Sequence, residues 1–189
     1  MPSTSEPDPR PLIGEPPSMD LLNTRWIDAD GTQDLLETVG GLAIWLDSPV
    51  IREVLGGRRV PADRATLDRV LQARRALAAA VDAPDPADAE AVAALNAVLE
   101  RGRVRRLLRW DGPAEEPEVA ERAWLPAWLA AEDYLRLLAD RPERIRPCAN
   151  PACILHFYDV SKNGTRRWCS MAGCGNRAKA LRHYARTRG

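Results

Sequence analysis

Residues 148–174 read CANPACILHFYDVSKNGTRRWCSMAGC and contain all four cysteines of the chain. The spacing is Cys148-x4-Cys153-x15-Cys169-x4-Cys174, two matched pairs separated by enough residues for a β-hairpin. Four thiolates complete the tetrahedral coordination of a structural zinc ion and leave no open position for catalysis. Neither pair has the two-residue spacing of a thioredoxin-like redox site. The stretch therefore predicts one structural Zn²⁺ ion.

Two other interpretations of the cysteines are disulfide bonds and buried thiols without a metal. Disulfide bonds are the less favoured interpretation, because the sequence shows no export signal. The N-terminus, MPSTSEPDPRP, is acidic and proline-rich where a secretory signal would be basic and then apolar. We expect a cytoplasmic protein, in which thiols stay reduced. A module of about 42 residues buries too little surface to fold without a metal or cross-links. His156 is a weaker ligand candidate, since four thiols already suffice.

The residues around the cysteines predict a hairpin. Residues 154–160 alternate well enough for one strand, residues 161–164 have the composition of a turn, and residues 165–168 return as a second strand. Asn150 and Pro151 predict a tight turn inside the first cysteine pair. A helix is expected to follow, with Ser170 as its N-cap.

A formal net charge of zero conceals an uneven distribution of charge. The chain has 27 Lys and Arg against 27 Asp and Glu. Residues 1–140 carry 16 basic and 25 acidic side chains, whereas residues 141–189 carry 11 basic and 2 acidic ones. Such asymmetry indicates that the basic part meets a polyanion or an acidic surface.

The last helix has one apolar and one basic face. Advancing by about 100° per residue places Ala178, Leu181 and Ala185 on the side of Cys174 and the basic residues away from it. Basic groups on this helix and on the preceding turn predict contacts with a phosphate backbone. The candidate nucleic-acid-binding residues are Lys162, Arg166, Arg167, Asn176, Arg177, Lys179, Arg182, His183 and Arg186.

Asn176 and Arg177 are the candidates for reading bases, because Asn and Arg make bidentate contacts to adenine and guanine in the major groove. Each has an alternative role within the protein. Asn176 can satisfy a local backbone group, and Arg177 can pack over Trp168 or pair with an acid. The whole basic face can also be solvated or dock on the acidic part of the same or a neighbouring chain.

The rest of the chain predicts a mainly helical domain with a short β element. A length of 189 residues suits one medium domain and a small module, and we expect a flexible tail at 1–17, a helical domain at 18–143 and a zinc module at 144–189. Helical periodicity covers residues 34–46, 49–55, a stretch from about 61 to 81, 86–101 and 126–140. In the fourth stretch Asp85 is the expected N-cap and Pro86 the first helical residue. Residues 104–110 predict a strand entering a turn at Asp111-Gly112, with no evident partner strand. The fold class is α+β, mainly α.

Two segments resemble known families. Residues 168–171 (WCSM) and 174–177 (CGNR), with Lys179 and the preceding Arg166-Arg167, are similar to the bacterial CGNR zinc finger. In that family the finger follows an ABATE domain, described as a putative stress-induced transcription regulator. Residues 19–26 (MDLLNTRW), 34–36 and 43–46 are similar to the start of that domain.

The resemblance implies that the four cysteines are the metal ligands and that the protein regulates transcription by binding DNA. Lys162 stands where the family usually has an arginine. A lysine still contacts a phosphate, but as a point charge without the bidentate fork.

We therefore predict a zinc-dependent, DNA-binding transcription regulator. The alternative is an interaction module whose basic finger docks on acidic protein or RNA. Catalysis is not expected, because the helical part has no histidine before His156 and no cysteine before Cys148. No apolar run has the roughly 18 residues of a membrane helix.

The helical domain has two expected roles, sensing a small-molecule effector or forming a homodimer. Asn23, Thr24 and Trp45 are candidates for lining an effector pocket. Helix capping and core packing are the alternative roles for these three residues.

Overall fold

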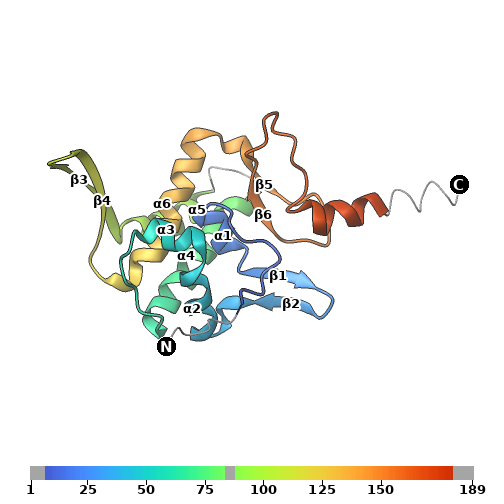
Figure 1. The fold of residues 1–189 in the computed structure, drawn as a ribbon, viewed down its shortest axis with the longest axis horizontal. Coiled ribbons are helices and arrows are strands. Elements are labelled where there is room, and N and C mark those ends of the chain that lie inside the picture. The colour runs from blue at the N-terminus through green and yellow to red at the C-terminus, as the bar shows by residue number, and fades with distance from the viewer. Residues whose placement is uncertain (1–6, 84–87, 181–189) are drawn as a thin grey trace, which may run out of the picture.

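The computed structural model describes residues 7–83 and 88–180. Short antiparallel hairpins are attached to a group of helices, which confirms a mixed α+β fold (Figure 1). The elements in chain order are α1 (Pro17–Leu22), β1 (Arg25–Asp28), β2 (Gly31–Asp34), η1 (Leu35–Glu37), α2 (Val39–Asp47), α3 (Pro49–Leu55), α4 (Arg64–Asp82), α5 (Ala89–Leu99), β3 (Gly102–Arg109), β4 (Gly112–Val119), η2 (Arg122–Trp124), α6 (Leu125–Asp140), η3 (Pro142–Arg144), β5 (Ile145–Pro147), β6 (His156–Tyr158) and the π-helical turn η4 (Met171–Gly175). No helix in the described part of the chain combines the length and the apolar composition needed to cross a membrane.

One hydrophobic core joins the helices to the cysteine-rich part. The α4 helix begins after Asp63, whose carboxylate accepts a hydrogen bond from the Thr66 amide, and it packs against α5 and α6. Trp45 is fully buried in this core, and so is Phe157 of β6. The same cluster of buried side chains includes Cys148, Cys169 and Cys174. The two parts of the chain are therefore packed as one body.

The segment before α1 is packed, so the prediction of a flexible tail over residues 1–17 is wrong for residues 7–17. Arg10 is only 6% exposed and forms ion pairs with Asp8 and Asp20, each at 2.7 Å. Glu15 is buried as well. The helix α1 then starts at Pro17, where a missing backbone N–H costs nothing. The prolines fix the course of the segment instead of keeping it mobile.

The helix predicted over residues 34–46 is divided in two. Thr38 adopts an extended conformation, and its hydroxyl accepts a hydrogen bond from the Gly41 amide, so α2 begins only at Val39. The residues before it form the hairpin β1–β2 and the short turn η1. This hairpin was not expected from the sequence.

The other predicted helices are found with shifted ends. The helix α3 is confirmed and ends at Gly56, whose φ of +56° favours glycine. The helix α5 begins at Ala89 after the N-cap Asp88, later than expected, whereas Asp85 and Pro86 lie outside the described residues. The helix α6 agrees with the periodicity of its sequence to within one residue.

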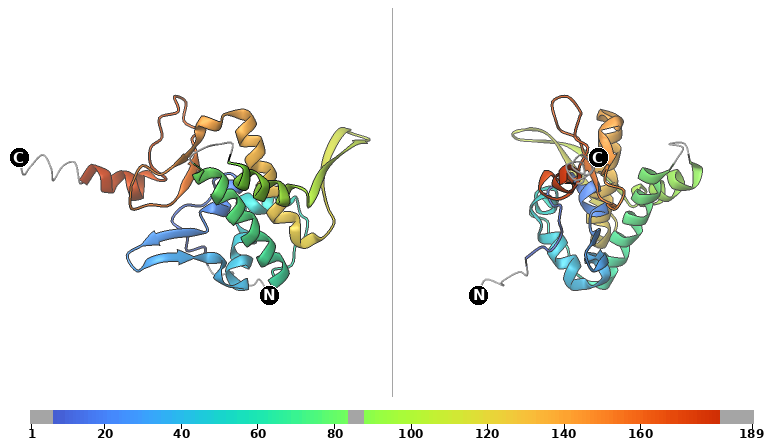
Figure 2. Two further views of the ribbon diagram at one scale, coloured as in Figure 1. Left: turned by 180° about the vertical axis from the view of Figure 1, so that it is seen from behind. Right: turned by 90° about the vertical axis from the view of Figure 1, so that its right-hand side faces the viewer.

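The predicted strand near residues 104–110 is confirmed as β3, and its partner is β4. The two strands form an isolated antiparallel hairpin from Gly102 paired with Val119 to Arg109 paired with Gly112. It projects from the helical body at the end opposite to the cysteine-rich part (Figures 1 and 2).

Two adjacent glycines at the start of α2 give a matched pair of substitutions. A Cβ on Gly41 would lie 1.6 Å from the carbonyl oxygen of Leu35, whereas the nearest atom to a Cβ on Gly40 is the Thr38 hydroxyl at 3.6 Å. We expect Gly41→Ala to lower the free energy of unfolding by about 1–3 kcal/mol or more, because backbone has to move. Gly40→Ala should be neutral or slightly stabilising. Urea denaturation compares them, and equal effects would contradict the steric explanation.

Candidate metal centre and nucleic-acid interface

The cysteine-rich part is organised by the short hairpin β5–β6. Ile145 pairs with Tyr158 and Pro147 pairs with His156, so the strands flank the loop that carries Cys148 and Cys153. The expected pairing of residues 154–160 with residues 165–168 is wrong. The second segment forms no strand.

In place of a second strand, a buried carboxylate accepts the hydrogen bonds of this segment's backbone amides. Asp159, 1% exposed, accepts hydrogen bonds from the backbone amides of Ser161 and Arg166. The predicted turn is present, closed by a hydrogen bond from the Gly164 amide to the Ser161 carbonyl. Arg144 donates to the carbonyls of Asp159 and Ser161. These bonds satisfy the loop's backbone without a ladder.

The four cysteine sulfurs converge on one point. All four Sγ atoms lie within 4.8 Å of one another, and those of Cys153 and Cys169 are 3.9 Å apart. A tetrahedron with Zn–S bonds of about 2.3 Å has sulfurs roughly 3.8 Å apart. The thiols are free of disulfide bonds, and Cys148, Cys169 and Cys174 are buried. The cluster is therefore suited to bind one zinc ion.

Hydrogen bonds to sulfur support this fit. The amide of Cys169 donates to Cys148 Sγ at 3.4 Å, and the Asn150 side chain donates to Cys174 Sγ at 3.2 Å. Asn150 is held in turn by the Ala152 amide, as the predicted turn requires. Donors of this kind stabilise thiolates and orient them toward a cation.

Ionisation of one cysteine thiol also affects the pKa of its neighbours. A hydrogen bond from the Cys169 thiol lowers the pKa of Cys153 to about 5. The same contact, together with burial, raises the pKa of Cys169. Four ionised thiols this close need a divalent cation among them, because like charges disfavour one another's ionisation.

The turn that bears the last ligand is tightly packed. Ser170 is the N-cap, as predicted, and its hydroxyl accepts a hydrogen bond from the Gly173 amide. A Cβ on Gly175 would lie 2.7 Å from the Met171 sulfur. A helix then continues from Asn176 through residue 180. The last helix therefore starts directly beside the metal centre.

Residues of α1 and the segment before it hold the cysteine-rich part. The Asn23 side chain both donates to the carbonyl of His156 and accepts from its amide, each at 2.9 Å. Glu15 accepts hydrogen bonds from the Tyr158 amide and from Arg166. Sequence reasoning missed Glu15 and gave Asn23 a different role, because their partners lie more than 130 residues away.

His156 is packed between the two parts. Its Nε2 lies 3.3 Å from a carboxylate oxygen of Asp82. Burial lowers the pKa of His156, so the ring is neutral at pH 7. His156 does not belong to the cysteine cluster, in agreement with its assignment as a structural residue.

The three residues proposed for an effector pocket are fully buried. Asn23 binds β6 as described. The Thr24 hydroxyl donates to the Leu21 carbonyl and accepts from Arg74. The indole of Trp45 donates to Asp20. Their contacts match the capping and packing roles, and we do not assign them to a ligand.

The predicted nucleic-acid-binding residues fall into three groups. Exposed side chains are those of Lys162, Arg167, Asn176, Arg177 and Lys179. Arg166 stacks over the Phe157 ring, pairs with Glu15 at 2.7 Å and donates to the Cys169 carbonyl, so it positions the loop. Outside the described residues lie Arg182, His183 and Arg186.

A cavity of about 250 Å³ lies beside the metal centre. Its lining includes Asn150, Arg167, Trp168, Cys174 and Arg177. The Arg167 guanidinium lies over the Trp168 ring at 5.4 Å. Packing over Trp168 was an alternative role expected for Arg177, whereas the structure places Arg167 there. The cavity combines an aromatic face with two cations next to a rigid ligand cluster.

Comparisons with known proteins agree with this geometry. Residues 15–141 match the model of the ABATE family, described as "Putative stress-induced transcription regulator". Residues 144–187 match the model of the CGNR zinc finger. No curated protein matches the chain. The resemblance inferred from the sequence is confirmed for both segments and for their order.

Proposed function

The chain belongs to the ABATE family, whose model is described as "Putative stress-induced transcription regulator", and from this membership we propose that it binds DNA through its CGNR zinc finger. The zinc ion would be held by Cys148, Cys153, Cys169 and Cys174 and would fix the loop and the last helix relative to each other. Catalysis forms no part of the proposal.

The observation that carries the proposal is the sign of the exposed charge. Among the described residues after Pro147, the only acidic residue is Asp159, which is enclosed by the backbone amides and by Arg144 and Arg146. Every exposed charged side chain in this stretch is therefore basic, and these are Lys162, Arg167, Arg177 and Lys179. A one-sign surface on a small rigid module is the electrostatic signature of phosphate binding.

The two arginines of the cavity have different tasks in this proposal. Arg177 stands at the start of the last helix, where a side chain reaches base edges when the helix lies in a major groove. Arg167 stacks on Trp168 and presents its charge to a phosphate. Asn176 is exposed beside Arg177. Among the described residues its amide makes a single long contact, 3.5 Å to the Ala172 carbonyl, which leaves it able to turn toward a base.

We propose that the acidic helical domain forms the dimer, because an operator with two half-sites requires two fingers. Its negative charge repels DNA, so contact is confined to the finger. Sensing of a small molecule was the other expected role, and nothing in the contacts of Asn23, Thr24 and Trp45 favours it.

Selection of bound sequences from a random duplex pool by the zinc-loaded full chain tests this function. With Lys162, Arg167 and Lys179 on phosphates, log affinity should fall with log salt at a slope of about −2.7. Absence of binding to any duplex at low salt would contradict the proposal. Tighter binding to RNA or to acidic protein would support the alternative function.

Single substitutions then separate phosphate contacts from base contacts. Arg167→Ala should weaken binding to all sequences and reduce the magnitude of the salt slope by about 0.9. Arg177→Ala should weaken binding to the selected sequence about tenfold or more and relax specificity at one position. The matched control is Arg75→Ala, an exposed arginine of α4 on the acidic domain, which should change neither quantity. Fluorescence anisotropy at several salt concentrations measures all three variants.

A further inference from the structure

The hairpin β3–β4 exposes an apolar surface that nothing in the described chain covers. At its tip Trp110 is 98% exposed and Leu108 is 82% exposed. Val104 and Leu108 share one face with their partners Pro117 and Pro113. A two-stranded hairpin is at best marginally stable alone in water, and exposed apolar surface of this kind marks a contact site.

The opposite face is occupied by ion pairs. Arg103 pairs with Glu118, and both Arg105 and Arg109 pair with Glu116. These contacts keep the hairpin in one register. The face of Val104 and Leu108 carries a further ion pair, between Arg106 and Glu115, so the exposed apolar side chains left for a partner are Val104, Leu108 and, at the tip, Trp110. We call this hairpin, residues 102–119, the arm.

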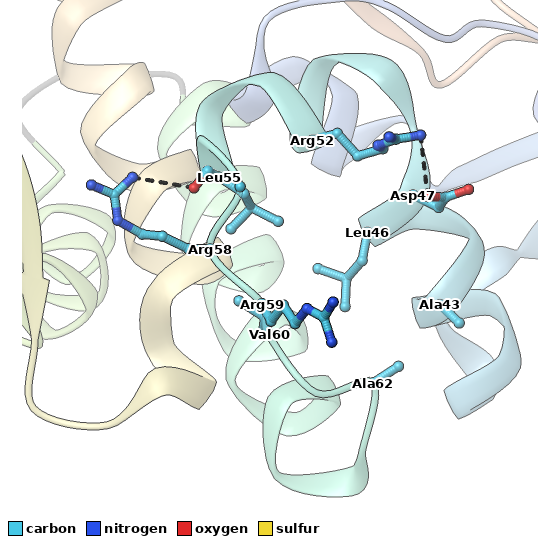
Figure 3. Close-up of a pocket in the computed structure, with 10 residues that line it drawn as sticks. Ala43, Leu46, Asp47, Arg52, Leu55, Arg58, Arg59, Val60 and Ala62 are labelled. Carbon is cyan, nitrogen blue, oxygen red and sulfur yellow. Dashed lines mark hydrogen bonds and ion pairs between the residues drawn. The ribbon is translucent and has the colours of Figure 1, made fainter.

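A cavity of about 640 Å³ lies between α2, α3 and the start of α4. Leu46, Leu55 and Val60 supply apolar walls, and the Arg59 head group points into the space between them (Figure 3). Two other arginines of its lining are engaged, since Arg52 pairs with Asp47 at 3.6 Å and Arg58 donates to the Leu55 carbonyl. Arg59 has no hydrogen bond or ion pair with any residue that the structure describes.

The tip of the arm is chemically complementary to this cavity. Trp110 supplies a large apolar side chain, and the next residue, Asp111, supplies a carboxylate that has no partner among the described residues. A Trp110 indole bound in this cavity would lie against Leu46 and Leu55, with the guanidinium of Arg59 above its ring or against the Asp111 carboxylate. Both unpaired charges are thereby neutralised in one contact.

The arm cannot fill the cavity of its own chain. Strands of 8 residues carry the tip about 27 Å from the root of the arm. The cavity lies near that root, because Arg58 and Arg59 also line a neighbouring cleft with Pro117, Glu118 and Val119 of β4. The tip that enters the cavity therefore comes from another molecule.

We propose that two copies of the chain form a homodimer by exchanging arms, with the tip residues Trp110 and Asp111 of each copy bound in the Arg59 cavity of the other. The contact is reciprocal, as a two-fold axis requires. The two arms then lie side by side in opposite directions, with the tip of each beside the root of the other. This arrangement covers the exposed Val104 and Leu108. The two fingers lie at the ends of the molecules opposite to the arms (Figure 2).

Sedimentation velocity of the zinc-loaded full chain, without DNA, tests the proposal independently of the proposed function. We expect a monomer–dimer equilibrium, and Trp110→Ala should raise the dissociation constant of the dimer about 30-fold or more. The control is Val160→Ala, which removes another exposed apolar side chain, 78% exposed, at the other end of the molecule. A wild-type chain that stays monomeric at high concentration, or a Trp110→Ala variant that dimerises normally, overturns the proposal.

A charge exchange tests the partner residues. Asp111→Arg and Arg59→Asp should each weaken the dimer about tenfold or more, because each places like charges together. The double variant restores the opposite pairing and should recover most of the loss. Neither side chain has a hydrogen bond or an ion pair with a described residue, so the thermal midpoint of the monomer should stay unchanged. Failure of the double variant to recover dimerisation overturns the assignment of this cavity.

Discussion

Removal of zinc by a chelator is expected to unfold the cysteine-rich part and to abolish DNA binding. Structural zinc contributes on the order of 10–16 kcal/mol at neutral pH in small fingers, which exceeds the stability of most domains. Because Cys148, Leu155 and Phe157 belong to the same core as the helices, the effect should extend beyond the finger. We expect a thermal midpoint lower by at least 10 °C for the whole chain.

Circular dichroism and fluorescence anisotropy, recorded on the same sample before and after chelation, measure the two losses. Zinc added back should restore both, whereas magnesium should restore neither, because thiolates bind zinc and not a hard cation. The variant Cys174→Ser should reproduce the chelated state at full zinc concentration. Unchanged stability and affinity after complete removal of zinc would contradict a structural metal.

Asp20→Ala is expected to have the largest effect of any substitution in the helical domain. The carboxylate is fully buried and accepts hydrogen bonds from Arg10, from the Trp45 indole and from the Gly14 amide. Burial raises the pKa of Asp20, although Arg10 beside it acts in the opposite direction. Removing one partner of a buried ion pair costs about 3–5 kcal/mol, because the other charge stays buried.

Urea denaturation of the zinc-loaded chain measures this loss. Asp20→Asn keeps the shape and one acceptor and should cost less than Asp20→Ala. The control is Asp30→Ala, an exposed aspartate in the turn between β1 and β2, with an expected change within about 0.5 kcal/mol. If the two alanine variants were equally stable, the segment before α1 would not be anchored by this pair.

The sequence predicted those elements whose signal is local. Cysteine spacing indicated the metal centre, and the apolar periodicity of residues 126–140 indicated α6. The strand β3 was evident from residues 104–110 and the following Asp111-Gly112 turn. In each case neighbouring residues alone carry the pattern.

Strands whose own residues carry no β signal were missed or given the wrong partner. The strand β4 contains Pro113, Pro117 and three glutamates, which have low β propensity. It pairs because arginines of β3 lie opposite those glutamates. The strand β6 was assigned the wrong partner because β5 has only three residues. Such short strands are specified by tertiary packing and carry no periodicity of their own.

The residues of the candidate site also divide into those with a local sequence signal and those without one. The four ligands were found from their spacing, and Ser170 from its capping chemistry. Arg166, by contrast, was assigned to nucleic acid because nothing local shows its ion pair with Glu15, which lies 151 residues earlier in the chain. Asn23 was a candidate for an effector pocket, with capping or core packing as its alternative, because a buried amide and a ligand-binding amide look alike in sequence.

Zinc fingers are often treated as portable cassettes that can be cut from one protein and grafted onto another. The double hydrogen bond between Asn23 and His156, together with the burial of Phe157, makes this finger part of its host. A graft of residues 144–189 alone would expose the apolar surface around Phe157 and leave the backbone groups of His156 without their Asn23 partner. A transferable unit would have to include α1 and the segment before it, so recombination between families is constrained by a helix more than 100 residues away.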